Sequence, residues 1–299
     1  MQVIRAKKMG FCHGVQKAFD TVNELSAEFA SKTANGNDDG NGLLILGDLV
    51  HNKEVVTAVE RAGLTTVYDT AGVTGRTVVI RTHGEQKERI EELASAGNVL
   101  VDCTCIIVKK VREKALALEQ RHPAVVICGK RKHPEIVGLV SWLSNPHVVL
   151  SAEDIAALPN YKSVGIVSQT TIASEQYEEC IRLLEEKYGK WNPEAGTGAE
   201  WLQTICAHTK RNQEASVETA GMVDLMIVVG AKHSSNSNKL FEKCKAANPN
   251  TIFVQGLADI DLSRLTPDSV VGISSGASTP DWIVDEIVQA LESLQPVSA

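Results

Sequence analysis

Three of the seven cysteines divide the 299-residue chain into segments of similar length: Cys12, Cys105 and Cys206. Amphipathic helical patterns begin directly after Cys12 and Cys105, and a less regular one follows Cys206. Thiolates are favoured at helix N-termini, and soft thiolate ligands select zinc or iron–sulfur clusters. Because one cysteine recurs at the same place in each segment, we predict that the three hold a single metal centre. The chain contains no CxxC pair of the kind that structural zinc sites use.

Cys103 competes with Cys105 for the second ligand position, since it lies two residues earlier in Asp102-Cys103-Thr104-Cys105. The repeat favours Cys105. A four-iron cluster normally takes four cysteines, so three ligands would leave one iron open to a substrate. We interpret three others as core thiols, because they lie in apolar or helical patterns: Cys128, Cys180 and Cys244.

Polar loops follow six apolar runs that are typical of buried strands. The runs are Leu43–Leu46, Val78–Arg81, Ala124–Cys128, Val164–Ser168, Leu225–Val229 and Val270–Ser274. Three of the loops carry a histidine: His51, His83 and His133. Together with Ser234, Ser235, Asn236 and Ser278, they offer donors that a phosphate or diphosphate accepts. Glu135 is the only acid in these loop motifs, which makes it the predicted proton donor, although a solvated first-turn carboxylate is the ordinary alternative.

Short apolar strands that alternate with amphipathic helices predict an α/β protein with parallel sheets covered on both faces. Such sheets bind ligands at the carboxyl ends of their strands, which is where the six loops lie. We expect three repeated lobes, at residues 1–103, 104–200 and 201–299, around a shared cavity.

The composition limits the classes of partner. A net charge of −7 argues against nucleic-acid or anionic-membrane binding, which requires a basic face. The sequence shows no apolar run of about 18 residues, and charged residues interrupt its first ten positions, so we expect a cytosolic protein. In a reducing compartment, an odd number of cysteines makes a disulfide framework improbable.

The motifs resemble the IspH/LytB family of 4-hydroxy-3-methylbut-2-enyl diphosphate reductases of the non-mevalonate isoprenoid pathway, nearly from end to end. The matching segments are Gly10-Phe11-Cys12-His13-Gly14-Val15, Val50-His51-Asn52, Thr82-His83-Gly84, Asp102-Cys103-Thr104-Cys105, His133-Pro134-Glu135, Gln169-Thr170-Thr171, Ser234-Ser235-Asn236-Ser237-Asn238 and Gly276-Ala277-Ser278. As a set they are far more specific than any one motif.

The resemblance implies a trefoil-like fold of three α/β lobes around one [4Fe–4S] cluster, carried by Cys12, Cys105 and Cys206. It also implies a reaction in which two electrons and two protons remove an allylic hydroxyl as water. Glu135 would supply protons with help from Thr170 and His133, and ferredoxin or flavodoxin would supply electrons. The implied diphosphate ligands are His51, His83, His133, Thr170, Ser234, Ser235, Asn236 and Ser278.

Other functions remain open from sequence alone. The chain could be an iron–sulfur redox sensor or carrier, a related reductase of another allylic substrate, or a metal-free protein that binds a phosphometabolite. The third reading leaves the cysteine repeat unexplained. Two departures from the family pattern adjoin the cysteines, His13 and Ile106, and they bear on cluster potential and substrate range.

Overall fold

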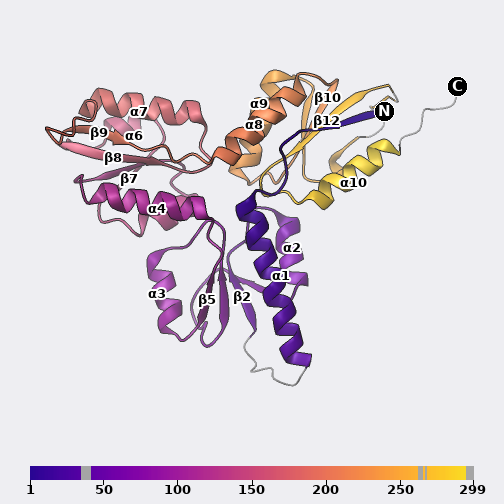
Figure 1. The fold of residues 1–299 in the computed structure, drawn as a ribbon, viewed down its shortest axis with the longest axis horizontal. Coiled ribbons are helices and arrows are strands. Elements are labelled where there is room, and N and C mark those ends of the chain that lie inside the picture. Colours follow the sequence, from indigo (N-terminus) through magenta and orange to yellow (C-terminus); the bar gives the residue numbers. More distant parts are fainter. Residues whose placement is uncertain (35–41, 262–264, 267, 294–299) are drawn as a thin grey trace. The chain divides into compact units, whose positions relative to one another are not determined.

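A computed structural model describes residues 1–34, 42–261, 265–266 and 268–293. The chain forms two compact units. The first unit contains the described residues of Met1–Lys17, Val50–Ala58 and Ala207–Ala299, and the second contains those of Ala18–Leu49 and Val59–Cys206. The elements of each unit are shown in Figure 1.

The second unit contains two four-stranded sheets in which every strand pair is parallel. Sheet 1 has the order β3-β2-β4-β5, with β2 at Leu43–Leu46, β3 at Thr65–Val67, β4 at Thr77–Ile80 and β5 at Val99–Asp102. Sheet 2 has the order β7-β6-β8-β9, with β6 at Val125–Cys128, β7 at Pro146–Val149, β8 at Ser163–Ser168 and β9 at Gly198–Trp201.

The first unit contains sheet 3, in which all pairs are also parallel and the order is β1-β12-β10-β11. Its strands are β1 at Gln2–Arg5, β10 at Leu225–Val229, β11 at Thr251–Val254 and β12 at Val270–Ser275. The N-terminal strand therefore completes a sheet whose other strands come from the C-terminal third of the chain, with Gln2 opposite Val270 and Arg5 opposite Ile273.

Ten helices lie between or after these strands in the described part of the chain, and parallel neighbours within a sheet need such crossover connections. They are α1 (His13–Ala34), α2 (Lys53–Arg61), α3 (Lys87–Ser95), α4 (Ile106–Glu119), α5 (Pro134–Val140), α6 (Ala152–Ala156), α7 (Ser174–Tyr188), α8 (Ala207–Ala220), α9 (Ser235–Ala247) and α10 (Asp281–Glu292), with a 3₁₀ turn η1 at Leu257–Asp259. Among these described helices, none is both long and apolar enough to cross a membrane.

Sheet 2 shows how the apolar runs are buried. Helix α4 covers one face, where Leu118 packs with Val125 and Ile127, and α7 covers the other, where Leu184 packs with Val126. The two helices lie on opposite sides of the strands in Figure 1. Because both faces are covered, every residue of β6 and β8 is buried. The strand pattern is therefore continuous rather than alternating.

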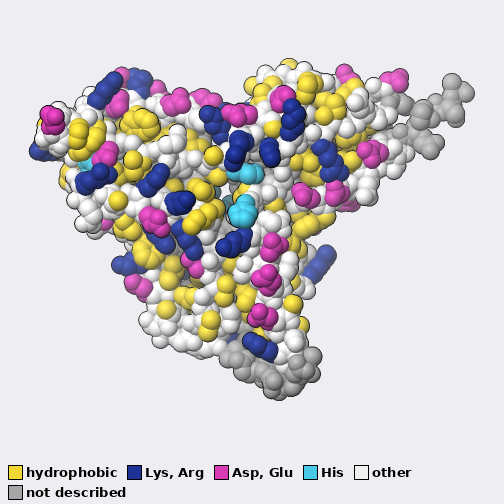
Figure 2. Space-filling view, viewed as in Figure 1, with side chains coloured by type: hydrophobic (Ala, Val, Ile, Leu, Met, Phe, Trp, Pro, Cys, Tyr) yellow, Lys and Arg dark blue, Asp and Glu magenta, His cyan; other side chains and the backbone are white. Residues whose placement is uncertain are grey.

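The prediction of an α/β fold with three small parallel sheets is confirmed. The three sheets share one plan, in which two central strands are flanked by one edge strand on each side. The lobe boundaries at 103/104 and 200/201 stay a prediction. Lys, Arg, Asp and Glu side chains are interspersed across the face shown in Figure 2, as is typical of a solvent-exposed protein surface.

Candidate functional site

The three repeated cysteines each lie between an edge strand of a sheet and the start of a helix. Cys12 directly precedes α1, Cys105 is the N-cap residue of α4, and Cys206 directly precedes α8. The preceding edge strands are β1, β5 and β9, which occupy the same position in their respective sheets. All three cysteines are half-buried, whereas Cys128, Cys180 and Cys244 are buried in hydrophobic cores.

One backbone hydrogen bond recurs at all three cysteines. In each case the cysteine N–H donates to a carbonyl in the polar loop after a central strand. The pairs are Cys12 to Ala277 at 3.2 Å, Cys105 to Thr82 at 2.9 Å and Cys206 to Thr170 at 2.9 Å. The backbone N–H of Cys103 instead donates to Ile80 and so continues the pairing of sheet 1. Cys105, rather than Cys103, therefore occupies the position that matches the other two.

Cys105 lies in the electrostatic neighbourhood of Cys206 and Glu135. Burial raises the pKa of the Cys105 thiol, the N–H groups of Ile107 and Val108 lower it, and the charges of Cys206 and Glu135 raise it further. Within the second unit, Cys105 thus lies near both another candidate ligand and the candidate acid. A thiolate in such a place needs a compensating positive charge, which a metal centre would provide.

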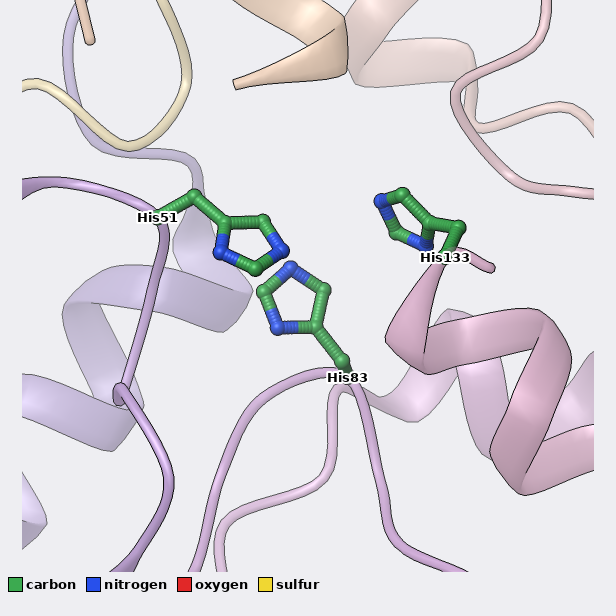
Figure 3. Close-up of side chains that lie close together, drawn as sticks. All are labelled: His51, His83 and His133. Atoms are coloured by element: carbon green, nitrogen blue, oxygen red, sulfur yellow. The ribbon is translucent and has the colours of Figure 1, made fainter. Parts of the chain in front are cut away.

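His83 and His133 lie side by side in the second unit (Figure 3). Their ring centroids are 5.5 Å apart and the rings are nearly perpendicular, at 81°. His133 is the N-cap residue of α5, and its Nδ1 accepts the N–H of Glu135 at 3.2 Å. In the neutral ring this places the proton on Nε2, which is then a donor.

Glu135 is 2% exposed and lies in the first turn of α5. Its Oε1 accepts the backbone N–H of Thr170 at 2.7 Å, and its Oε2 accepts the Thr170 hydroxyl at 2.8 Å. Burial raises the pKa of Glu135 to about 7, against the opposing effect of the Thr170 hydrogen bonds. A carboxyl group with this pKa is available both as an acid and as a base near neutral pH.

The first unit contains polar groups of a different kind. Ser234 caps α9 by accepting the N–H of Ser237, and Asn236 and Ser278 are close to the carboxyl ends of β10 and β12. Asn236 Nδ2 and Ser278 Oγ are buried and have no hydrogen-bond partner within the described residues. Buried polar atoms are costly to leave unpaired, so these two indicate a ligand that accepts hydrogen bonds.

His51 lies in the loop that precedes α2, where it is half-buried. The next residue, Asn52, holds this loop through two side-chain bonds. Its Nδ2 donates to the Ser278 carbonyl at 3.0 Å, and its Oδ1 accepts the Glu54 N–H at 3.0 Å. In the first unit, therefore, the His51 loop and the Ser278 loop are joined directly.

Two further buried residues, one in a loop and one in the first turn of α9, were not predicted as site residues from the sequence. The expectation that Glu135 is the only acid is wrong, because the loop after β4 extends to Gln86 and contains the buried Glu85. Ser237 is also fully buried beside Gly230 and Gly276, and its Oγ has no partner within the described residues. Glu85 could have been identified from the sequence, because it lies only two residues after His83.

Comparison with known proteins gives consistent matches over the full chain. The family model described as LytB protein matches residues 3–292. The 4-hydroxy-3-methylbut-2-enyl diphosphate reductase of Alkaliphilus oremlandii is 33% identical over 98% of this chain and all of its own length. The enzyme of the same name from Geobacter sulfurreducens is also 33% identical, over 98% of this chain and 97% of its own.

Solved structures agree with these matches. The structure described as (E)-4-hydroxy-3-methyl-but-2-enyl diphosphate reductase, the terminal enzyme of the non-mevalonate pathway, is similar with a TM-score of 0.73 at 30% identity, over 98% of this chain and 100% of its own. A reductase structure from Plasmodium falciparum has the same fold, with a TM-score of 0.84 at 24% identity over 98% of this chain and 88% of its own. From the full-length matches to the family model and to these relatives, we conclude that the chain belongs to the LytB family.

Proposed function

We propose that this protein is a reductase of 4-hydroxy-3-methylbut-2-enyl diphosphate in the non-mevalonate isoprenoid pathway. The reaction consumes two electrons and two protons, breaks the allylic C–O bond, releases water and forms isopentenyl and dimethylallyl diphosphates. The observation that carries the proposal is Glu135, a buried acid with a pKa of about 7 that lies near the repeated cysteine Cys105 in a chain of the LytB family.

The cysteines suit one [4Fe–4S] cluster per chain, held by Cys12, Cys105 and Cys206. Their half-burial keeps the thiols accessible, and their matching backbone hydrogen bonds hold three equivalent ligand positions. Protein side chains alone do not carry out such one-electron chemistry, and a bound cluster would supply the electrons. Ferredoxin or flavodoxin is the expected source of those electrons in the cytoplasm.

The diphosphate would be bound by hydrogen-bond donors of the polar loops and helix starts. We assign His51, His83, His133, Thr170, Ser234, Ser235, Asn236 and Ser278 to this role. Asn236 Nδ2 and Ser278 Oγ support the assignment, because they have no hydrogen-bond partner within the described part of the chain and phosphate oxygens would satisfy them. An acidic protein needs such a local set of donors to hold an anion.

Proton delivery falls to Glu135. Hydroxide is a poor leaving group, so departure of the hydroxyl requires a proton from a positioned acid. Thr170 orients the carboxyl group through two hydrogen bonds, and the His133 ring holds the backbone of Glu135. Thr170 and His133 would therefore act with Glu135 as one acid unit.

A turnover assay tests the function. Anaerobically reconstituted protein should contain about four irons per chain. After reduction, its electrons should be consumed only when the substrate is added, with formation of both five-carbon diphosphates. A cluster that is stable in its reduced form in the presence of substrate would instead indicate a redox carrier or sensor.

A further inference from the structure

The loop that carries His83 is built around a buried carboxylate. The side chain of Glu85 is 2% exposed and lies between two arginines, with Oε2 3.1 Å from Arg81 Nη2 and Oε1 3.3 Å from Arg89 Nη1. Its Oε1 also accepts the backbone N–H of Gln86 at 3.0 Å. A buried charge of this kind is tolerated only when it is paired and hydrogen-bonded, so its surroundings are strongly constrained.

The two arginines come from opposite sides of the loop. Arg81 directly follows β4, and Arg89 lies in the first turn of α3. The turn between them closes at Gly84, whose N–H donates to the Arg81 carbonyl at 3.0 Å and whose φ of 77° favours glycine. Glu85 therefore ties the strand end to the helix start, with His83 held in between.

The same loop rests directly on α5. A Cβ atom built on Gly138 would lie 3.4 Å from the carbonyl oxygen of Glu85, so the helix backbone and the loop backbone touch. Just beyond, the N–H of Lys87 donates to Ser141 Oγ at 2.9 Å, and Ser141 Oγ donates to the Gly138 carbonyl at 2.7 Å. One serine hydroxyl thus bridges the segment after His83 and the end of the helix that begins after His133.

These contacts determine how the two histidines face each other. His83 is two residues before Glu85, and His133 is the N-cap of the seven-residue helix that carries Gly138. A shift of the loop along α5 would change the 5.5 Å separation of the rings. Binding groups must be held to within roughly 0.5 Å to act together on one ligand.

We propose that Glu85 and Ser141 are positioning residues that set the separation of His83 and His133 and thereby the affinity for the diphosphate group. The inference rests on the proposed function, because it assumes that the two histidines bind that group. Glu85 and Ser141 themselves touch neither the substrate nor the cluster in this scheme.

The test uses cluster-loaded protein with inorganic pyrophosphate as the binding probe, together with steady-state kinetics. Ser141→Ala and Glu85→Gln should each weaken pyrophosphate binding and raise KM by about 10-fold, the effect expected when roughly one hydrogen bond to a charged acceptor is impaired. Iron content and the cluster absorbance should be unchanged, and kcat at saturation should stay within about 3-fold.

Two matched variants control for a general loss of stability. Ser151→Ala removes the N-cap of α6, a helix of the second unit that follows β7. It should lower Tm by about 2–4 °C without changing pyrophosphate affinity. Glu179→Gln removes an exposed carboxylate that pairs with Arg182, and should change neither property.

The outcomes separate the two proposals. Wild-type affinity and KM in Ser141→Ala and in folded Glu85→Gln would overturn the positioning role and leave the reductase function intact. Absence of pyrophosphate binding and of substrate reduction in the wild-type protein would overturn the proposed function and this inference with it. If Glu85→Gln does not fold, Ser141→Ala alone decides the matter.

Discussion

The two units differ in how their buried polar groups are hydrogen-bonded. In the second unit, two buried carboxyl groups are paired within the protein, since Glu135 is bonded to Thr170 and Glu85 to two arginines. In the first unit, Asn236 Nδ2 and Ser278 Oγ are buried without a partner among the described residues. The second unit therefore contains a preorganised acid, and the first contains buried hydrogen-bond donors that an anion would satisfy.

The largest expected effect is the loss of the cluster. Replacement of Cys12, Cys105 or Cys206 by Ser should abolish iron binding after anaerobic reconstitution, because each removes one of three equivalent thiolates. Cys103→Ser serves as the control and should retain about four irons per chain. Equal iron loss in Cys103→Ser and Cys105→Ser would show that the second ligand is wrongly assigned.

The next effect concerns Glu135, whose carboxyl group is hydrogen-bonded to Thr170. Glu135→Gln should lower kcat by about 10²–10⁴-fold, since a positioned general acid contributes that much. The amide can still accept the Thr170 N–H and donate to its hydroxyl oxygen, so iron content and pyrophosphate affinity should be retained. Near wild-type turnover in this variant would mean that protons arrive by another route.

The raised pKa of Glu135 should also appear as a pH dependence of stability. The pKa is about 7 in the folded protein and 4.5 in the unfolded reference, so the folded state binds more protons between these values. Stability should therefore fall as the pH rises from about 4.5 to 7 and then level off, by about 3 kcal/mol in total from this group. Chemical denaturation of cluster-free protein over this range should show the fall in wild type, and Glu135→Gln should lack this component. Parallel stability curves for the two proteins would contradict the shifted pKa.

The smallest effect concerns Asn236, whose buried Nδ2 has no hydrogen-bond partner within the described residues. Asn236→Ala should weaken pyrophosphate binding by about 10-fold, the value of roughly one hydrogen bond to a charged acceptor. Because the Nδ2 atom has no hydrogen-bond partner among the residues that the structure describes, the same change should cost little stability beyond lost packing. Thr170→Val provides the contrast, since it leaves Glu135 Oε2 without its donor and should lower Tm even without ligand. Comparable Tm losses in both variants would contradict the distinction between the hydrogen-bonded Thr170 and the buried Asn236 amide nitrogen.

The local sequence was sufficient to predict the central strands. The runs Leu43–Leu46 and Leu225–Val229 are strands with the expected bounds, and the other four agree to within one residue at each end. Such strands can be predicted from the sequence because parallel strands covered on both faces are apolar throughout and are followed by polar loops. The cysteines before α1, α4 and α8 could also be predicted from local sequence, because each recurs at the start of a helical pattern.

The tertiary structure alone decided which distant segments pair. The first strand joins the sheet formed by the last three, and nothing local in Gln2–Arg5 specifies Val270–Ser275 as its neighbour. Likewise, Arg81 and Arg89 are each four residues from Glu85 in the sequence, but only the folded turn at Gly84 brings both against its carboxylate. The distant Gly138 then packs on the backbone of this loop. Periodicity and residue type report whether a segment is buried, whereas pairing, burial of a charge and a raised pKa depend on neighbours that only the folded chain brings together.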